Sequence, residues 1–404
     1  MEAAPLIELR RVVKTLGSTR VLDGVDLKIY RGEITAVIGK SGSGKSVLLK
    51  HIIGLFEPDE GDIFIEGQSR AERSAAEKRQ LKRKFSYVFQ DTALFDFLTV
   101  FENVALPLAE RRDRSPEEIG RRVREKLHQL DLGDVGEKYP SQLSGGMKKR
   151  VALARALVTE PEIVLFDEPT TGLDPIRKNA VHSMILEYQQ RYGFTGVVVS
   201  HEIPDIFFIA QRVAMIDEGK IRFEGTPEEI QRAADPEVRA FIEGLESPRD
   251  DLTGIDSHPI GQKRLLQEMI RLQRHEIPFS IVLLAMENRA GTERIGGHET
   301  GQQVFKLFAN HVTQNTYITD TCFRFDINKI MVVLPDTNRE QADRFCRKIS
   351  RTLEGHPLLD ALEENAGFRY AVRAGIAQAR AGLDLADLIA EAQQGLSVFY
   401  ESRP

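Results

Sequence analysis

Short apolar runs alternate with amphipathic stretches along roughly the first 245 residues of the chain. Residues 6–29 predict two short strands joined by a turn at residues 17–18. The β-branched run ITAVI at residues 34–38 predicts a buried strand, and residues 100–137 have the apolar spacing of helices. This alternation of strands and helices predicts an α/β fold that contains a helical insert.

A second pattern follows a polar, turn-rich stretch at residues 247–259. We therefore expect one domain over residues 1–246, a linker over 247–259 and a second domain over 260–404. The predicted order within the second domain is β-α-β-β-α-β-α, ending in a helix over residues 385–400. This order indicates an α+β domain of ferredoxin-like plan, with antiparallel strands and helices on one face of the sheet.

A glycine-rich segment, GKSGSGKS, joins the strand at residues 34–38 to the apolar helical pattern that follows. A strand, such a loop and a helix in this order predict a phosphate-binding P-loop rather than a simple connecting turn. Glycines let successive N–H groups face one anion, and the helix adds the positive end of its dipole. ATP is the expected ligand, and Ser46 offers its hydroxyl to Mg²⁺. The expected nucleotide contacts come from Gly39, Ser41, Gly42, Gly44, Lys45 and Ser46.

A second glycine-containing segment, LSGGM, occupies residues 143–147 and precedes a predicted helix over residues 148–158. Ser144, Gly145 and Gly146 present N–H groups at a positive helix end, which makes a second anion site. Because the P-loop already supplies one phosphate cradle in each chain, we expect the second cradle to contact the nucleotide that is bound to another chain. The two cradles predict a head-to-tail homodimer that holds two ATP molecules.

Two adjacent carboxylates end the apolar segment IVLFDEP at residues 163–169. A buried carboxylate is costly without a cation, so we place Asp167 on Mg²⁺ and expect Glu168 to polarise the attacking water. His201 follows another apolar strand, at residues 196–200. A lone histidine there is more often structural. Its position after the other motifs favours a catalytic role instead.

Taken together, these motifs resemble the nucleotide-binding subunit of ATP-binding-cassette (ABC) transporters over about the first 245 residues. The resemblance implies Walker A at residues 39–46, the Q-loop glutamine at Gln90, the signature at residues 143–147, Walker B at Asp167 with the catalytic Glu168, the D-loop aspartate at Asp174 and the switch histidine at His201. It also implies that Gln90 serves both hydrolysis and Mg²⁺, and that Asp174 lies at the nucleotide.

Two positions depart from the family pattern. Met147 ends the signature in place of the common glutamine, and Leu16 stands where many members stack an aromatic ring on adenine. Because base stacking contributes about 1–3 kcal/mol per base, the second change weakens adenine binding unless another side chain substitutes. Phosphate and Mg²⁺ contacts should still dominate ATP affinity.

Within the family, residues 89–108 and 235–246 are similar to the phospholipid-trafficking ATPases of the Mla type. The resemblance implies an integral membrane permease and an MCE-type lipid-binding subunit as partners. It also implies a peripheral position on the cytoplasmic face of the inner membrane. The face with Phe95, Phe97 and Phe101 is either a permease-docking groove or part of the core, because an apolar stripe packs inward as often as not.

The second domain resembles the GGDEF domain of diguanylate cyclases, with its entry motif at residues 251–254 and its signature turn at 324–330. A cyclase needs carboxylates for two metal ions, but this sequence has Ala285 at the first metal position and Asn328-Lys329 at the signature carboxylates. A lysine there repels Mg²⁺. Tyr317 also replaces the arginine of the product-inhibition motif. We expect a non-catalytic domain that regulates or dimerises the protein.

Composition and charge argue against several classes of function. The chain is 41% hydrophobic and 29% charged, as globular proteins are, and its net charge of -6 argues against a nucleic-acid partner. No stretch reaches the roughly 18 apolar residues of a membrane span, so a role at a membrane would be peripheral. Cys322 and Cys346 lack the spacing of a metal site and are expected in the core.

Two alternatives from other classes stay open. One is a soluble ABC ATPase with no transport role, although such proteins usually have paired cassettes or long inserts. The other is a signalling protein whose GGDEF-like domain binds or makes a cyclic dinucleotide.

Overall fold

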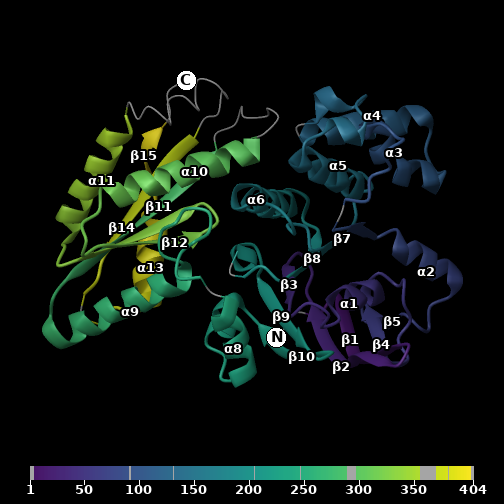
Figure 1. The fold of residues 1–404 in the computed structure, drawn as a ribbon, viewed down its shortest axis with the longest axis horizontal. Helices are drawn as coiled ribbons and strands as arrows, with labels where there is room; N and C mark the ends of the chain where they lie inside the picture. The colour runs from purple at the N-terminus through teal and green to yellow at the C-terminus, as the bar shows by residue number, and fades with distance from the viewer. Residues whose placement is uncertain are drawn as a thin grey trace. The chain divides into compact units, whose positions relative to one another are not determined.

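A computed structural model of the chain describes all residues except 1–3, 91, 131, 204, 246, 289–296, 355–369, 381 and 402–404. The chain divides into two compact units (Figure 1). The first comprises Met1–Leu173 and Val181–Leu245, and the second comprises Asp174–Ala180 and Glu246–Pro404. Glu246, the expected last residue of the first domain, lies outside the described residues.

Two sheets form the first unit. The antiparallel sheet has the order β2-β1-β4-β5, made of β1 (Ile7–Leu16), β2 (Thr19–Ile29), β4 (Glu60–Ile65) and β5 (Gln68–Ser69). The other has the order β10-β9-β3-β8-β7-β6, made of β3 (Ile34–Ile38), β6 (Phe85–Val88), β7 (Ile163–Asp167), β8 (Thr195–Ser200), β9 (Arg212–Asp217) and β10 (Lys220–Gly225). All neighbours in this second sheet are parallel except the edge strand β10.

The parallel strands are apolar on both faces because both faces are covered. Every residue of β3 and β8 is buried, which explains why these strands show no alternation in the sequence. Val37 and Leu165 of the parallel sheet share one buried cluster with Leu9 and Ile63 of the antiparallel sheet. The carboxyl ends of β3, β7 and β8 consequently lie at one edge of a rigid core, which is where α/β sheets bind ligands.

In this part of the chain a helix follows the P-loop, and helices lie within residues 100–137, as predicted. The helices are α1 (Lys45–Ile52), α2 (Ala75–Lys82), α3 (Val100–Arg111), α4 (Pro116–Gln129), α5 (Gly145–Leu157), α6 (Pro175–Tyr192), α7 (Pro227–Gln231) and α8 (Pro236–Leu245), with short 3-10 turns at Gly133–Val135, Pro140–Gln142 and Asp205–Phe208. Figure 1 shows α3 and α4, which lie within the predicted insert at residues 100–137, grouped with α5, and each of the three helices contacts the other two. The α/β fold with a helical insert is therefore confirmed.

The start of α5 differs from the prediction. The helix begins at Gly145 and not at residue 148, so both glycines of LSGGM belong to its first turn. Ser144 is its N-cap, and the Ser144 hydroxyl accepts a hydrogen bond from the N–H of Met147. A side-chain cap compensates for the low helix propensity of two consecutive glycines.

A five-stranded sheet with the order β12-β13-β11-β14-β15 forms the second unit, and all its neighbouring strands are antiparallel. Its strands are β11 (Phe279–Asn288), β12 (Thr321–Asp326), β13 (Lys329–Pro335), β14 (Tyr370–Gln378) and β15 (Ser397–Glu401), and its helices are α9 (His258–His275), α10 (Gly297–Gln314), α11 (Arg339–Leu353) and α13 (Leu385–Gln394). The first four strands follow the predicted ferredoxin-like plan.

Helices cover both faces of this sheet, so the prediction of helices on one face was wrong. In the central strand β11, Val282 and Leu284 belong to a cluster with Phe305 of α10. Ile281, on the opposite face, belongs to a second cluster with Leu265 of α9. A central strand that is apolar at consecutive positions needs cover on both sides.

Two other expectations fail at the ends of this unit. The predicted helix over residues 385–400 ends at Gln394, and β15 then pairs with β14. Residues 247–259 are not a free linker, because Leu252 and Ile255 are buried in the core of the second unit. Pairing with β14 and burial of apolar side chains, both tertiary effects, override the local pattern in these segments.

Both cysteines are buried, as predicted, and burial raises the pKa of Cys322 and Cys346 to about 12. No helix in the described residues combines the length and the apolarity that crossing a membrane requires.

A buried ion pair joins the residue before the entry motif to the signature turn. Arg324 is fully buried, and its Nη1 donates to Oδ2 of Asp250 at 2.9 Å. The N–H and the hydroxyl of Thr253 donate to Oδ1 of the same carboxylate. Burial opposes ionisation of Asp250, yet the charge of Arg324 and the hydrogen bonds lower its pKa overall.

We expect Asp250→Ala to destabilise the second unit by about 3–5 kcal/mol, because it removes the carboxylate that faces a buried guanidinium. Native-state hydrogen exchange of the β11 and β13 amides measures this loss. Asp251→Ala, at the exposed neighbouring carboxylate, should leave exchange unchanged. Since the pKa of Asp250 is lowered, its contribution is present above the unfolded-state pKa of about 3.9 and disappears as pH falls further. Equal exchange in both variants would contradict this role.

Candidate nucleotide-binding site

The loop between β3 and α1 has a backbone that requires its glycines. Gly39, Gly42 and Gly44 all have positive φ, at 155°, 79° and 102°. A Cβ at Gly39 would lie 2.1 Å from the carbonyl oxygen of Ile216, a distance that no side chain can adopt. The glycines therefore let the chain close around a small concave space, as a phosphate cradle needs.

Lys45, the first residue of α1, lies inside this loop. Its buried ammonium donates to the carbonyl oxygens of Gly39 and Lys40, both at 2.8 Å. Burial lowers the pKa of Lys45, while the carboxylates of Glu168 and Asp167 act in the opposite direction. The lysine is thus held by backbone carbonyls at the place where phosphate oxygens would enter.

Asp167 receives a hydrogen bond on each of its carboxylate oxygens. The Ser46 hydroxyl donates to Oδ1 at 2.9 Å, and the Tyr87 hydroxyl donates to Oδ2 at 2.7 Å. Burial raises the pKa of Tyr87, and the hydrogen bond to Asp167 adds to the effect, so this phenol remains a donor. The sequence predicted Ser46 and Asp167 but missed Tyr87.

The oxygens of Ser46 and Asp167 fit a magnesium ion. Mg²⁺ binds hard oxygen ligands in an octahedron at about 2.0–2.1 Å, so two adjacent ligand atoms lie about 2.9 Å apart. The Ser46 Oγ and the Asp167 Oδ1 have this separation, at 2.9 Å. The third residue assigned to the metal, Gln90, follows β6 and is exposed.

Glu168 and His201 lie together because β7 and β8 are adjacent parallel strands. The Nδ1 of His201 is 3.3 Å from Oε2 of Glu168, and the hydroxyl of Thr171 donates to the same oxygen at 2.9 Å. Glu168 has a left-handed φ of 47°, while its N–H donates to the carbonyl of Val199. Such a backbone costs about 1–3 kcal/mol and persists where the surroundings hold it, often at functional sites. A carboxylate and an imidazole in contact can orient a water molecule.

Helix α5 holds the segment that follows Gln90. Thr92 and Ala93 both have positive φ, and their carbonyl oxygens accept hydrogen bonds from Arg155 at 2.7 and 2.6 Å. Lys149 donates to the carbonyl of Gln90 at 3.4 Å. The sequence assigned no role to either cation. The loop that contains Gln90 is therefore tied to the helix that begins at the signature.

Ser144 and Gly145 are exposed, and Gly146 is half-buried, at the N-terminus of α5. No hydrogen bond among the described residues joins residues 143–147 to the loop at 39–46. The two predicted anion sites are therefore not linked by hydrogen bonds within one chain. Asp174 accepts hydrogen bonds from the N–H groups of residues 176 and 177, at the start of α6. Leu16 is exposed at the end of β1.

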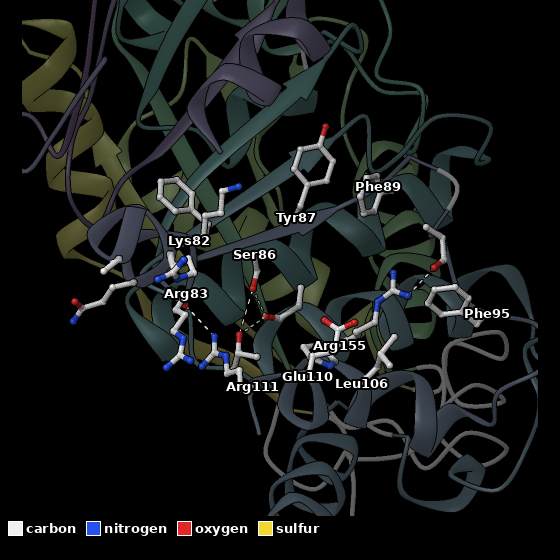
Figure 2. Close-up of a pocket in the computed structure, with 18 residues that line it drawn as sticks. Lys82, Arg83, Ser86, Tyr87, Phe89, Phe95, Leu106, Glu110, Arg111 and Arg155 are labelled. Carbon is white, nitrogen blue, oxygen red and sulfur yellow. Dashed lines mark hydrogen bonds between the residues drawn. The ribbon is translucent and has the colours of Figure 1, made fainter. Parts of the chain in front are cut away.

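A cleft of about 970 Å³ lies next to this site, lined by α2, β6, α3 and α5 (Figure 2). Phe89 and Phe95 line it and are 46% and 42% exposed, and Phe97, beside Phe95, is 75% exposed. The alternative that these phenylalanines belong to the core is therefore wrong for Phe95 and Phe97. The charged side chains that line the cleft are Arg79, Lys82, Arg83, Glu110, Arg111 and Arg155.

Comparisons with known proteins agree with this geometry. Residues 22–171 match the ABC transporter family, and residues 247–401 match the diguanylate cyclase GGDEF domain. The intermembrane phospholipid transport system ATP-binding protein MlaF of Escherichia coli K12 is 38% identical over 242 residues, which are 60% of this chain and 90% of that protein. The probable ribonucleotide transport ATP-binding protein mkl of Mycobacterium tuberculosis H37Rv is 38% identical over 59% of this chain and 66% of that protein.

Two solved structures share the fold of the first unit. The cbiO1 protein of Clostridium perfringens, part of an ABC transporter complex, is 29% identical with a TM-score of 0.53, over 58% of this chain and 94% of that chain. The ATP-binding cassette MJ0796, a dimer bound to ADP and Pi, is 34% identical with a TM-score of 0.50, over 55% of this chain and 98% of that chain.

Proposed function

This chain is an ATPase that belongs to the family of ABC transporter ATP-binding proteins, and we propose that it drives phospholipid movement between the inner and outer membranes. The observation that carries the ATPase assignment is the constellation at one sheet edge. There Lys45 lies in a glycine cradle, Ser46 contacts Asp167, and Glu168 contacts His201. The phospholipid cargo is supported by the similarity to MlaF over most of that protein's length.

The chemistry follows from the residues of this site. The loop at residues 39–44 and Lys45 bind and orient the phosphates of ATP, and Ser46 and Asp167 would hold Mg²⁺. When bound, that ion would neutralise negative charge on the phosphates. Glu168, fixed by the Thr171 hydroxyl, accepts a hydrogen bond from the attacking water and orients it in line with the γ-phosphate. His201 contacts the same carboxylate and faces the same edge.

The active form is a head-to-tail homodimer. Among the described residues of one chain, no hydrogen bond joins the exposed N-terminus of α5 to the P-loop. Helix α5 has 13 residues, which is long enough for its N-terminus to attract an anion. Ser144, Gly145 and Gly146 of one copy would therefore contact the nucleotide of the other copy, and Asp174 would line the same interface. The dimeric state of the similar MJ0796 cassette supports this arrangement.

The permease binds in the cleft next to Gln90. Exposed phenylalanine rings form an apolar part of the cleft, while five of its six charged side chains are cationic. This combination fits a short cytoplasmic segment with apolar anchors and acidic side chains. The chain would then be a peripheral protein on the cytoplasmic face of the inner membrane, and an MCE-type lipid-binding subunit would complete the transporter.

The second unit acts as a non-catalytic regulatory or dimerising domain. Lys329 pairs with Ala285 in the β11–β13 register, and its ammonium lies 2.6 Å from a carboxylate oxygen of Asp326. The described residues of this unit contain no cluster of three metal-binding side chains. An internal cation thus neutralises the carboxylate at the turn where a cyclase would need a metal ion.

Glu168→Gln should bind ATP and form stable dimers, while its hydrolysis rate falls by about 10²–10⁴, because the amide cannot accept the proton of the water. Phosphate release and light scattering measure the two properties. Glu162→Gln, at an exposed ion pair on the same unit, is the matched control and should hydrolyse ATP normally. Normal turnover by Glu168→Gln would remove the catalytic assignment.

Reversing the charge of the cleft with Arg83→Glu and Arg111→Glu should prevent co-purification of the membrane permease, since an acidic segment would then be repelled. The ATPase rate of the isolated chain should persist, because neither side chain lies in the nucleotide site. Arg121→Glu, on the exposed face of α4, tests the effect of charge alone. A permease that still co-purifies with the double variant would disprove docking in this cleft.

The GGDEF match favours one alternative, a cyclic-dinucleotide synthase, and the two functions differ in a direct assay. With GTP and Mg²⁺ we expect no cyclic dinucleotide, because Lys329 and Ala285 replace metal-binding carboxylates. Chromatography of the reaction mixture measures the product. Any product that disappears in an Asp326→Ala variant would show that the second unit is catalytic.

A further inference from the structure

Tyr87 connects the wall of the cleft to the carboxylate assigned to Mg²⁺. Consecutive side chains of β6 point to opposite faces of the sheet. The Ser86 hydroxyl donates to the carbonyl of Ala156 at 2.7 Å, whereas the Tyr87 hydroxyl donates to Asp167. Figure 2 shows the Tyr87 hydroxyl pointing away from Ser86 and Arg111. Tyr87 is therefore one of the residues that line the cleft, and its hydroxyl is directed at Asp167.

The carboxylate of Asp167 is held by donors from two separate elements. Ser46 lies in α1 and contacts Oδ1, and Tyr87 lies in β6 and contacts Oδ2. Hydrogen bonds to the outer atoms of a ligand fix its orientation and tune its affinity for the metal. Ser46 is itself assigned to Mg²⁺, so Tyr87 is the partner of Asp167 that has no assigned contact with the ion.

A second contact links the Tyr87 ring to the exposed part of the cleft. The rings of Tyr87 and Phe89 have centroids 4.5 Å apart, and both residues line the cleft. Phe89 is 46% exposed, so a segment that enters the cleft meets this ring. A displaced Phe89 ring would shift Tyr87, and the hydroxyl of Tyr87 cannot move without changing its contact with Asp167.

We propose that Tyr87 is a positioning residue, which sets the Asp167 carboxylate for Mg²⁺ and transmits movement of the cleft wall to it. The proposal rests on the nucleotide site described above. A segment bound in the cleft would therefore change the affinity of the nucleotide site for the metal ion and not its affinity for ATP.

The first experiment compares Tyr87→Phe with Ser86→Ala, both in full-length protein with Glu168→Gln to prevent turnover. Mn²⁺ serves as the probe for the metal, and electron paramagnetic resonance measures its binding in the presence of ATP. We expect Tyr87→Phe to weaken Mn²⁺ binding by about 10-fold, because the ring stays and only the hydrogen bond is lost. Metal-free binding of ATP, measured with a chelator, should not change. Ser86→Ala should leave both affinities unchanged.

Four outcomes would overturn the proposal. Unchanged Mn²⁺ affinity in Tyr87→Phe would show that the hydroxyl does not position the carboxylate. Equal losses in Tyr87→Phe and Ser86→Ala, or a parallel loss of metal-free ATP binding, would indicate general damage to β6. A parent protein that binds neither ATP nor Mn²⁺ would instead overturn the proposed function, and the proposal with it.

The second experiment tests transmission from the cleft with a double-mutant cycle. Phe89→Leu should weaken Mn²⁺ binding a few-fold when Tyr87 is present and have no effect in the Tyr87→Phe protein, since coupled residues are not additive. An additive loss, or no effect of Phe89→Leu in either protein, would overturn the transmission step.

Discussion

The structure of the first unit depends on how a carboxylate at the end of a buried strand is stabilised. Asp167 ends β7, a strand whose other residues are all buried, and ionised groups are costly in such surroundings without partners. Two hydroxyl donors, from Ser46 and Tyr87, meet this requirement. Because the donors belong to α1 and β6, this one side chain ties the P-loop to the strand that leads into the cleft.

The carboxylates of the two units have different partners. In the first unit, oxygen atoms of Ser46 and Asp167 have the separation of adjacent magnesium ligands, and the nearby carboxylate of Glu168 is paired with hydroxyl and imidazole groups. In the second unit, Lys329 supplies the positive charge internally, beside Asp326. The carboxylates of Asp167 and Glu168 are therefore held mainly by hydrogen-bond donors, whereas the carboxylate of Asp326 is paired with an ammonium group.

Local chemistry made much of the fold and the site predictable. Positive φ values and the close carbonyl oxygen of Ile216 require glycine in the P-loop. The glycine pattern in the sequence therefore predicts the backbone conformation of this loop. The apolar runs of β3 and β8 identify buried parallel strands for a similar reason. In contrast, β15 was predicted as part of a helix, because the helical pattern of α13 continues to Tyr400 and only β14 offers the alternative pairing.

The sequence by itself determined the P-loop, the glycine-containing helix start at residues 144–146 and the acidic strand end, because each is a short contiguous segment with its own backbone requirement. Only the tertiary structure revealed Tyr87 as the partner of Asp167, 80 positions away, and Arg155 as the partner of Ala93, 62 positions away. It alone also placed helices on both faces of the second sheet. Contacts between distant positions leave no local pattern of spacing or hydrophobicity, so folding alone decides them.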